Sequence, residues 1–145
     1  AATPLHMCMV AGAVANGGVM MEPRLLARVE SPTGVVRLKY SQKAYTKACT
    51  PEIAAKLDAY MKDVVKSGTG TQAQVSGLTA AGKTGSAESS VDGKDVTHAW
   101  FVGYIADEKY PYAVSVLVEG GGSGGSVAAP IAGEIFAYLK RNAAQ

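Results

Sequence analysis

The 145-residue sequence lacks several features that would each point to a particular class of protein. It has no apolar run of about 18 residues, and its N-terminal segment lacks the order of a signal peptide. Any membrane anchor is therefore expected to lie outside this chain. A large excess of positive or negative charge is also lacking, because the sequence has 14 lysines and arginines and 12 aspartates and glutamates. Without a long basic run, nucleic acid is not an expected partner.

Cysteine is scarce, and its positions favour no bridge or metal centre. Cys8 lies in an apolar helical run and Cys49 comes just before a helix start, without metal-ligand spacing. We expect two free, packed thiols, although the pair could bond. The sequence does have 48% apolar residues, 18% charged residues and 17 glycines. This composition is typical of one folded globular unit with many turns.

Three segments are expected to be helical. The segment from Thr3 to Asn16 is apolar on nearly every face and ends at Asn16-Gly17-Gly18, so we expect it to be buried by neighbours. A second helix should begin at Thr50-Pro51-Glu52, with an N-cap, a proline and an acid in order, and end at Gly68. Within it, Asp58 can pair with Lys62. Helical spacing returns from Ala128 to Arg141, with Pro130 in the first turn.

Strand patterns occupy most of the remaining sequence. We expect a hairpin around Ser31-Pro32-Thr33-Gly34, then a polar loop through Lys47, and a flexible glycine loop from Gly120 to Ser126. Three successive strands are expected at Thr79 to Glu88, Thr97 to Ala106 and Tyr112 to Glu119. This order of elements predicts an α+β fold in which helices flank an antiparallel sheet.

Two catalytic motifs overlap between Gly77 and Ser86. Read from Gly77, the residues spell GxxxxGKT, the phosphate-binding loop of nucleotide hydrolases. That loop needs a buried apolar strand before it and a helix beginning at the lysine. The residues before Gly77 are polar, and those after Thr84 would end a helix rather than begin one. A nucleotide hydrolase using Gly77 to Thr84 is therefore kept only as an alternative.

Read from Lys83, the same residues spell KTGS, and we place them on a strand that lines a cleft. Side chains at alternate strand positions face the same way, so Thr84 and Ser86 should point together. Two hydroxyls and the Lys83 ammonium would suit a substrate that ends in a carboxylate. Gly85 would let the substrate backbone approach closely and pair as an added strand.

The neighbours of this tetrapeptide resemble a known family. Gly68-Thr69-Gly70-Thr71, then Ala80 to Glu88, then His98-Ala99-Trp100-Phe101-Val102-Gly103-Tyr104 are similar, in order and spacing, to the transpeptidase domain of penicillin-binding proteins. The resemblance covers nearly the whole chain and is greatest to the class B, monofunctional members. It implies a penicillin-binding enzyme that β-lactams inhibit, without a cofactor, at the extracytoplasmic face of the bacterial membrane.

The resemblance also implies roles for particular residues. Lys83 would face the substrate carboxylate, and the hydroxyls of Thr84 and Ser86 would bind the terminal carboxylate of a stem peptide ending in D-Ala-D-Ala. The Ser86 amide would form half of the oxyanion hole, a donor worth about 3 kcal/mol. Gly82 and Gly85 would permit close approach of the substrate.

Two family motifs are absent from this sequence. No serine is followed by lysine three residues later, or by asparagine two residues later, so SxxK and SxN are both missing. We therefore expect residues 1–145 to be the C-terminal portion of a single transpeptidase domain, inactive alone. Its partners would be the stem peptide, β-lactams and the remaining half of the domain, and exposed apolar surface would favour self-association.

The polar residues also allow other assignments. A hydrolase triad could combine His98 with Ser86 and one of Asp92, Asp95 or Asp107, but no GxSxG turn surrounds the serine. We expect His98 instead to be hydrogen-bonded at the sheet edge, with Trp100 packing on the same face. Glu88, Asp92 and Asp95 are expected to be solvated charge rather than metal ligands. A non-catalytic carboxylate-binding module is a further alternative.

Overall fold

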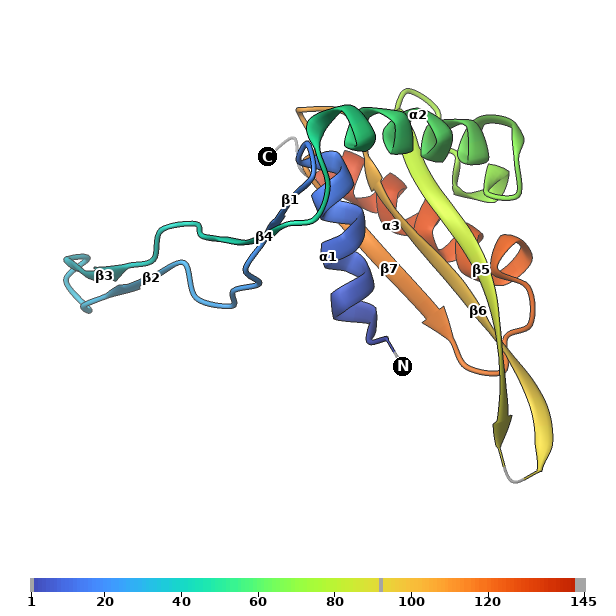
Figure 1. The fold of residues 1–145 in the computed structure, drawn as a ribbon. Helices are drawn as coiled ribbons and strands as arrows, with labels where there is room; N and C mark the ends of the chain where they lie inside the picture. Colours follow the sequence, from blue (N-terminus) through green and yellow to red (C-terminus); the bar gives the residue numbers. More distant parts are fainter. Residues whose placement is uncertain (1, 92, 143–145) are drawn as a thin grey trace.

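The computed structural model describes residues 2–91 and 93–142, which form three helices around a three-stranded antiparallel sheet (Figure 1). The helices are α1 (Pro4–Ala15), α2 (Pro51–Ser67) and α3 (Ala129–Asn142). The sheet consists of β5 (Ala80–Val91), β6 (Lys94–Ile105) and β7 (Ala113–Val118). The expected α+β fold and the three expected strands are confirmed.

Strand β6 is the centre of this sheet, since the strand order is β5-β6-β7. Its register pairs Lys83 with Val102 and Ser86 with Ala99 on one side, and Phe101 with Val116 on the other. Strand β5 is therefore an edge strand within the described sheet, and its tetrapeptide lies along that edge. The extended β5–β6 hairpin is the longest projection of the sheet in Figure 1.

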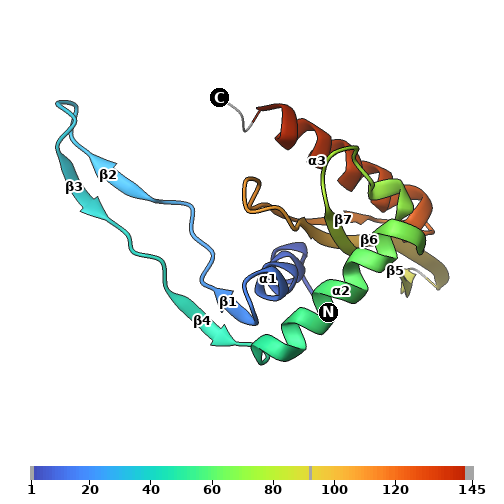
Figure 2. The ribbon, with the colours of Figure 1, turned by 90° about the horizontal axis from the view of Figure 1, so that it is seen from above.

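Helices cover both faces of the sheet, as the view from above shows (Figure 2). On one face, Phe101 and Val116 pack with Phe136 of α3 in the larger core cluster. On the other face, Ala81 and Tyr104 pack against Ala11 of α1. Tyr104, Phe101 and Phe136 are the largest fully buried side chains among the described residues, so the core sits on the central strand.

Helices α1 and α2 begin and end as the sequence predicts. Thr3 caps α1 by accepting from the His6 amide at 3.2 Å, and Thr50 caps α2 by accepting from the Ile53 amide at 3.4 Å. The expected Asp58–Lys62 pair is present at 2.6 Å. Helix α1 is less covered than its composition predicts, because Leu5 is 58% exposed. Within the described residues, no helix has both the length and the apolar character needed to cross a membrane.

Residues 19–47 form a long two-stranded projection, which we call the arm. Next to helix α1, β1 (Val19–Met21) pairs with β4 (Ala44–Lys47), and farther out β2 (Arg28–Glu30) pairs with β3 (Val36–Lys39). The arm extends away from the helices and the sheet in both views (Figures 1 and 2). The expected hairpin is confirmed, but the polar loop expected through Lys47 is wrong, because it contains β4.

The segment after β7 also differs from the expected flexible loop. Residues Gly124–Ala128 form a π-helical turn that continues directly into α3. Gly120 and Gly122 adopt positive φ angles of 65° and 75°, so the glycines are used in the turn that precedes this helical segment. The loop is therefore shorter than the sequence predicts, and its second half is part of the helical layer.

Both cysteines are free thiols, as expected. Cys8 lies on α1 and Cys49 just before α2, and both are half-buried. Burial raises the pKa of the Cys8 thiol, which disfavours the reactive thiolate.

Candidate functional site

The outer edge of β5 presents backbone groups that the sheet does not use. The Thr79 carbonyl accepts from the Ala106 amide at 2.8 Å, which fixes which residues of β5 face β6. Because such pairs alternate along an antiparallel ladder, Lys83 and Gly85 bond to β6. The amides and carbonyls of Thr84 and Ser86 point the opposite way, toward the open edge. This edge can therefore accept an added extended chain.

Lys83 is exposed, and its ammonium lies over this edge. Its Nζ donates to the carbonyl oxygen of Thr84 at 2.5 Å. This bond agrees with the outward direction of the Thr84 carbonyl. A positive charge is thus held beside the outward-facing backbone of the strand, where an anionic ligand would be attracted.

Ser86 is contacted by the start of the π-helical turn. The Gly124 amide donates to the Ser86 Oγ at 3.3 Å, which leaves the Ser86 hydroxyl proton free to donate. Gly124 is required here, because a Cβ would overlap the carbonyl oxygens of Gly85 and Trp100. The segment before α3 therefore lies directly on the strand beside Ser86.

Thr84 is buried, with 8% of its surface exposed, and its hydroxyl already has a partner. The Oγ1 atoms of Thr69 and Thr84 lie 2.6 Å apart. Thr69 belongs to the turn between α2 and a short 3-10 helix at Thr71–Ala73. Sequence reasoning gave Thr69 no role, although the Gly-Thr-Gly pattern around it was part of the resemblance.

These elements line an open cavity of about 780 Å³. All four residues of the Lys83–Ser86 tetrapeptide line it. The opposite walls come from the Thr69 turn and from the segment that leads into α3, including Ser126. The structure thus brings the expected site residues together in one cavity and adds two walls that the sequence did not predict.

Comparison with known proteins decides which family uses this arrangement. The family model for the penicillin binding protein transpeptidase domain matches residues 1–137. The chain belongs to this family.

Curated relatives in the transpeptidase family are much longer than this chain. Peptidoglycan D,D-transpeptidase PbpA of Mycolicibacterium smegmatis is 33% identical over an alignment of 137 residues that covers 90% of this chain and 28% of the relative. Peptidoglycan D,D-transpeptidase MrdA of Acinetobacter baumannii is 30% identical over 94% of this chain and 22% of the relative. The chain thus spans roughly a quarter of the length of these proteins.

Solved structures of transpeptidases share the fold. The ceftriaxone acyl-enzyme of penicillin-binding protein A from M. tuberculosis matches with a TM-score of 0.85 and 31% identity, over 94% of this chain and 32% of that chain. The D,D-transpeptidase domain of a peptidoglycan glycosyltransferase from Eggerthella lenta matches with a TM-score of 0.83 and 32% identity, over 97% and 32% of the two chains. The matched region therefore includes the arm as well as the sheet and helices.

The extended conformation of β5 at Lys83 rules out the phosphate-loop interpretation. Lys83 lies within β5, four residues into an extended strand that continues to Val91. Gly77 lies in a turn with a φ of 71°, and no helix begins at Lys83 or Thr84. The nucleotide-hydrolase alternative is therefore wrong, because the amides after the lysine are committed to a strand instead of ringing a phosphate.

His98 is not placed to activate Ser86. Its Nε2 lies 2.7 Å from the Ser89 Oγ, and its Nδ1 accepts from the Gly120 amide at 3.3 Å. Because Nδ1 accepts, the neutral ring carries its proton on Nε2 and donates to Ser89, so it cannot act as a base there. His98 is hydrogen-bonded, as expected, and it lies just beyond the end of the β6–β7 ladder, where β6 pairs only with β5.

The acidic residues weighed as ligands or triad members form no centre in the described part of the chain. Glu88 and Asp95 are exposed, and Asp107 Oδ1 accepts from the Lys109 amide in its own turn. Asp92 lies outside the described residues. Residues 2–91 and 93–142 contain no group of three or more His, Cys, Asp or Glu side chains arranged to hold a metal ion.

Gly82 has a packing role that the sequence did not reveal. A Cβ at this position would overlap the ring of Phe101, which is fully buried. Gly85 is less constrained, since its Cβ would lie 3.3 Å from the Trp100 Cβ. Only glycine at position 82 lets the Phe101 ring fill the core beneath β5.

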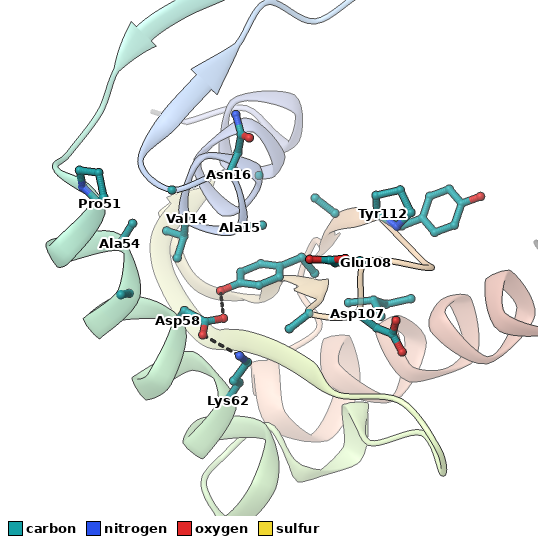
Figure 3. Close-up of a pocket in the computed structure, with 18 residues that line it drawn as sticks. Val14, Ala15, Asn16, Pro51, Ala54, Asp58, Lys62, Asp107, Glu108 and Tyr112 are labelled. Atoms are coloured by element: carbon teal, nitrogen blue, oxygen red, sulfur yellow. Dashed lines mark hydrogen bonds and ion pairs between the residues drawn. The ribbon is translucent and has the colours of Figure 1, made fainter.

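A second cavity, of about 640 Å³, lies between the end of α1, the first half of α2 and the β6–β7 turn (Figure 3). At its base the Tyr104 hydroxyl donates to Asp58 Oδ1 at 2.9 Å, and Asp58 Oδ2 pairs with Lys62. Burial, and then the hydrogen bond to Asp58, raise the pKa of Tyr104. These polar groups satisfy one another, so we interpret the network as structural.

Proposed function

We propose that this chain is the C-terminal, substrate-binding portion, residues 1–145, of the single transpeptidase domain of a peptidoglycan D,D-transpeptidase. The longer protein would cross-link cell-wall stem peptides through a serine acyl-enzyme. The observation that carries this proposal is the Lys83–Ser86 tetrapeptide, which lies along an open strand edge and lines a cavity. A substrate backbone added to this edge would place its terminal carboxylate beside Lys83.

Each residue of the tetrapeptide takes a distinct role in this proposal. Lys83 attracts the carboxylate, and the free proton of Ser86 donates to it. The Ser86 amide, which points away from β6, stabilises the developing oxyanion; such a donor contributes about 3 kcal/mol. Gly85 keeps the edge low for the approaching chain, and Thr84 supplies a second hydroxyl within the same cavity.

The acyl-forming serine would come from the rest of the longer protein. None of the serines in this chain has a lysine three residues later. Penicillin-binding protein A, which shares the fold, has been solved as ceftriaxone, imipenem and penicillin G acyl-enzymes. By this likeness the partners of our chain's site are a stem peptide ending in D-Ala-D-Ala and β-lactams, at the extracytoplasmic face of the bacterial membrane.

The rest of the domain is a further proposed partner. Leu5 on α1 and several apolar side chains of the arm are exposed in this chain, among them Leu25, Leu26 and Tyr45. Exposed apolar patches of this kind mark surfaces that bind protein. The isolated chain should therefore self-associate, and light scattering behind a size-exclusion column at several concentrations measures this. A strictly monomeric species would contradict it.

A fluorescent penicillin tests the proposal. The full-length protein should form a covalent adduct, and Lys83→Ala should slow acylation about 10- to 100-fold, the loss expected for a hydrogen bond to a charged group. Lys43→Ala, on the arm, is the matched control and should react at the parental rate. The isolated chain should form no adduct.

Two results would contradict it. A stoichiometric adduct on any serine of residues 1–145 would overturn the assignment of this chain as the part without the nucleophile. Reversible binding to the full-length protein without acylation would instead indicate a non-catalytic carboxylate-binding module.

A further inference from the structure

The turn that holds Thr69 is fixed on two sides. The Gly68 and Gly70 amides both donate to the Val64 carbonyl, at 3.1 and 3.0 Å, which folds the turn back onto the end of α2. On the other side Gly125 packs against it, since a Cβ at Gly125 would lie 2.6 Å from the Thr69 carbonyl oxygen. The close packing of these glycines places the Thr69 side chain at one position above β5.

At that position Thr69 meets one residue of the tetrapeptide. Its Oγ1 lies 2.6 Å from the Oγ1 of Thr84, and both residues line the 780 Å³ cavity. Thr69 itself is exposed, whereas Thr84 is buried. The contact therefore joins an open residue on one wall of the cavity to a buried hydroxyl on the other.

The number of hydroxyl protons on Thr69 and Thr84 limits how many hydrogen bonds the two residues can donate to a ligand. Each hydroxyl has one proton, and one of the two protons occupies the bond between Thr69 and Thr84. One proton is left for an acceptor in the cavity. If Thr69 donates to Thr84, the remaining proton is that of Thr84, on the same strand as Ser86. Serial donation also polarises the second hydroxyl and strengthens its bond to a charged acceptor.

We propose that Thr69 is a positioning residue for the substrate carboxylate: it donates to Thr84 and thereby directs the Thr84 proton into the cavity. The inference rests on the proposed function, because it assumes a carboxylate bound beside Lys83 and Ser86. Without the Thr69 donor, the Thr84 hydroxyl is free to rotate toward other acceptors and is no longer prepared for the ligand.

The test uses the full-length protein and separates binding of a β-lactam before acylation from the acylation step itself. Thr69→Val keeps the shape and removes the hydroxyl, and it should weaken binding about tenfold, as loss of one good hydrogen bond does. Thr69→Ser should restore binding to within about twofold. Thr84→Val should cost more than Thr69→Val, and the double variant should cost no more than Thr84→Val alone, because the two hydroxyls act as one unit.

A neutral ester of the same β-lactam gives a readout that a merely structural role would not change. The ester has no carboxylate, so the parent and Thr69→Val should bind it equally. Thr46→Val is the matched control, since Thr46 lies on the exposed strand β4 of the arm and does not line the cavity. This variant should behave as the parent with both compounds.

The outcomes separate this inference from the proposed function. If the parent protein is not acylated at all, the proposed function fails. If the parent is acylated and Lys83→Ala slows it, but Thr69→Val binds like the parent, the inference alone is overturned. Equal losses of Thr69→Val with acid and ester, or a greater loss for Thr69→Val than for Thr84→Val, would also overturn it.

Discussion

The body of the molecule and its arm both contain antiparallel β-strands but are stabilised very differently. We use "body" for α1, α2, α3 and the β5–β7 sheet. In the body, Phe101 of the central strand is fully buried and packs with α3. In the arm, every residue of β2, β3 and β4 is exposed. Isolated two-stranded hairpins are marginally stable in water, so the arm depends on what covers it.

The difference between body and arm shows which part of the chain positions the Lys83–Ser86 tetrapeptide. The Lys83–Ser86 tetrapeptide lies on a strand whose inner partner, β6, carries the core. Its position is therefore fixed by burial within this chain. The arm carries exposed apolar side chains and supplies no residue to the 780 Å³ cavity. The exposed apolar side chains of the arm and the residues that line the cavity are therefore separate sets.

Hydrogen exchange should show the largest contrast between the two regions. Amides of β6 should exchange only on global unfolding, which typically requires a free energy of about 5–15 kcal/mol. Amides of β2 and β3 should exchange by local opening, for which the free energy is close to zero. Mass spectrometry of peptic peptides from the isolated chain measures both. Equal protection of the arm and β6 at a concentration where the chain is monomeric would remove the distinction.

Core truncation should show a smaller contrast. Phe101→Ala should lower the free energy of unfolding by about 3–5 kcal/mol, because it leaves a cavity under β5. Leu38→Ala, on the arm and 47% exposed, should change it by no more than about 0.5 kcal/mol. Urea unfolding followed by circular dichroism makes the comparison. A comparable loss at Leu38 would mean that the arm contributes to the core.

Removal of a tyrosine hydroxyl should show the smallest contrast. Tyr104→Phe deletes a bond to the Asp58 carboxylate and should cost about 1.5 kcal/mol at neutral pH, whereas Tyr45→Phe on the exposed arm should cost nothing measurable.

The difference in folding stability between the parent and Tyr104→Phe should depend on pH. The folded-state pKa of Tyr104 is raised above the unfolded value of about 10, so the unfolded state loses this proton first. The stability due to Tyr104 is therefore present below about pH 10 and is lost as the pH rises further. The advantage of the parent over Tyr104→Phe should shrink above pH 10. A constant difference from pH 8 to pH 11 would contradict the raised pKa.

Much of the body could be predicted because its signals are local. Thr50-Pro51-Glu52 carries the cap and dipole chemistry of a helix start within three residues, and the helix begins there. The strand at Lys83 could be distinguished from a phosphate loop because its flanks lack the chemistry that such a loop needs. Helix starts and strand patterns of this kind do not depend on distant residues.

The sequence-based predictions were wrong or incomplete where the structure depends on contacts between residues far apart in the sequence. Strand β4 has only four residues, and its partner β1 lies on the far side of the β2–β3 hairpin, so no local pattern marks it. The contact between Thr69 and Thr84 depends on how the turn after α2 folds over β5. The reason for Gly82 is visible only once the ring of Phe101 is placed beneath it.

A crystal structure of the full-length protein acylated by a β-lactam tests the central claim most directly. We predict that the ligand carboxylate lies within hydrogen-bond distance of Ser86 Oγ and near Lys83 Nζ, with the acyl oxygen against the Ser86 amide. A ligand carboxylate bound away from the β5 edge, or an acyl oxygen without contact to the Ser86 amide, would contradict the account.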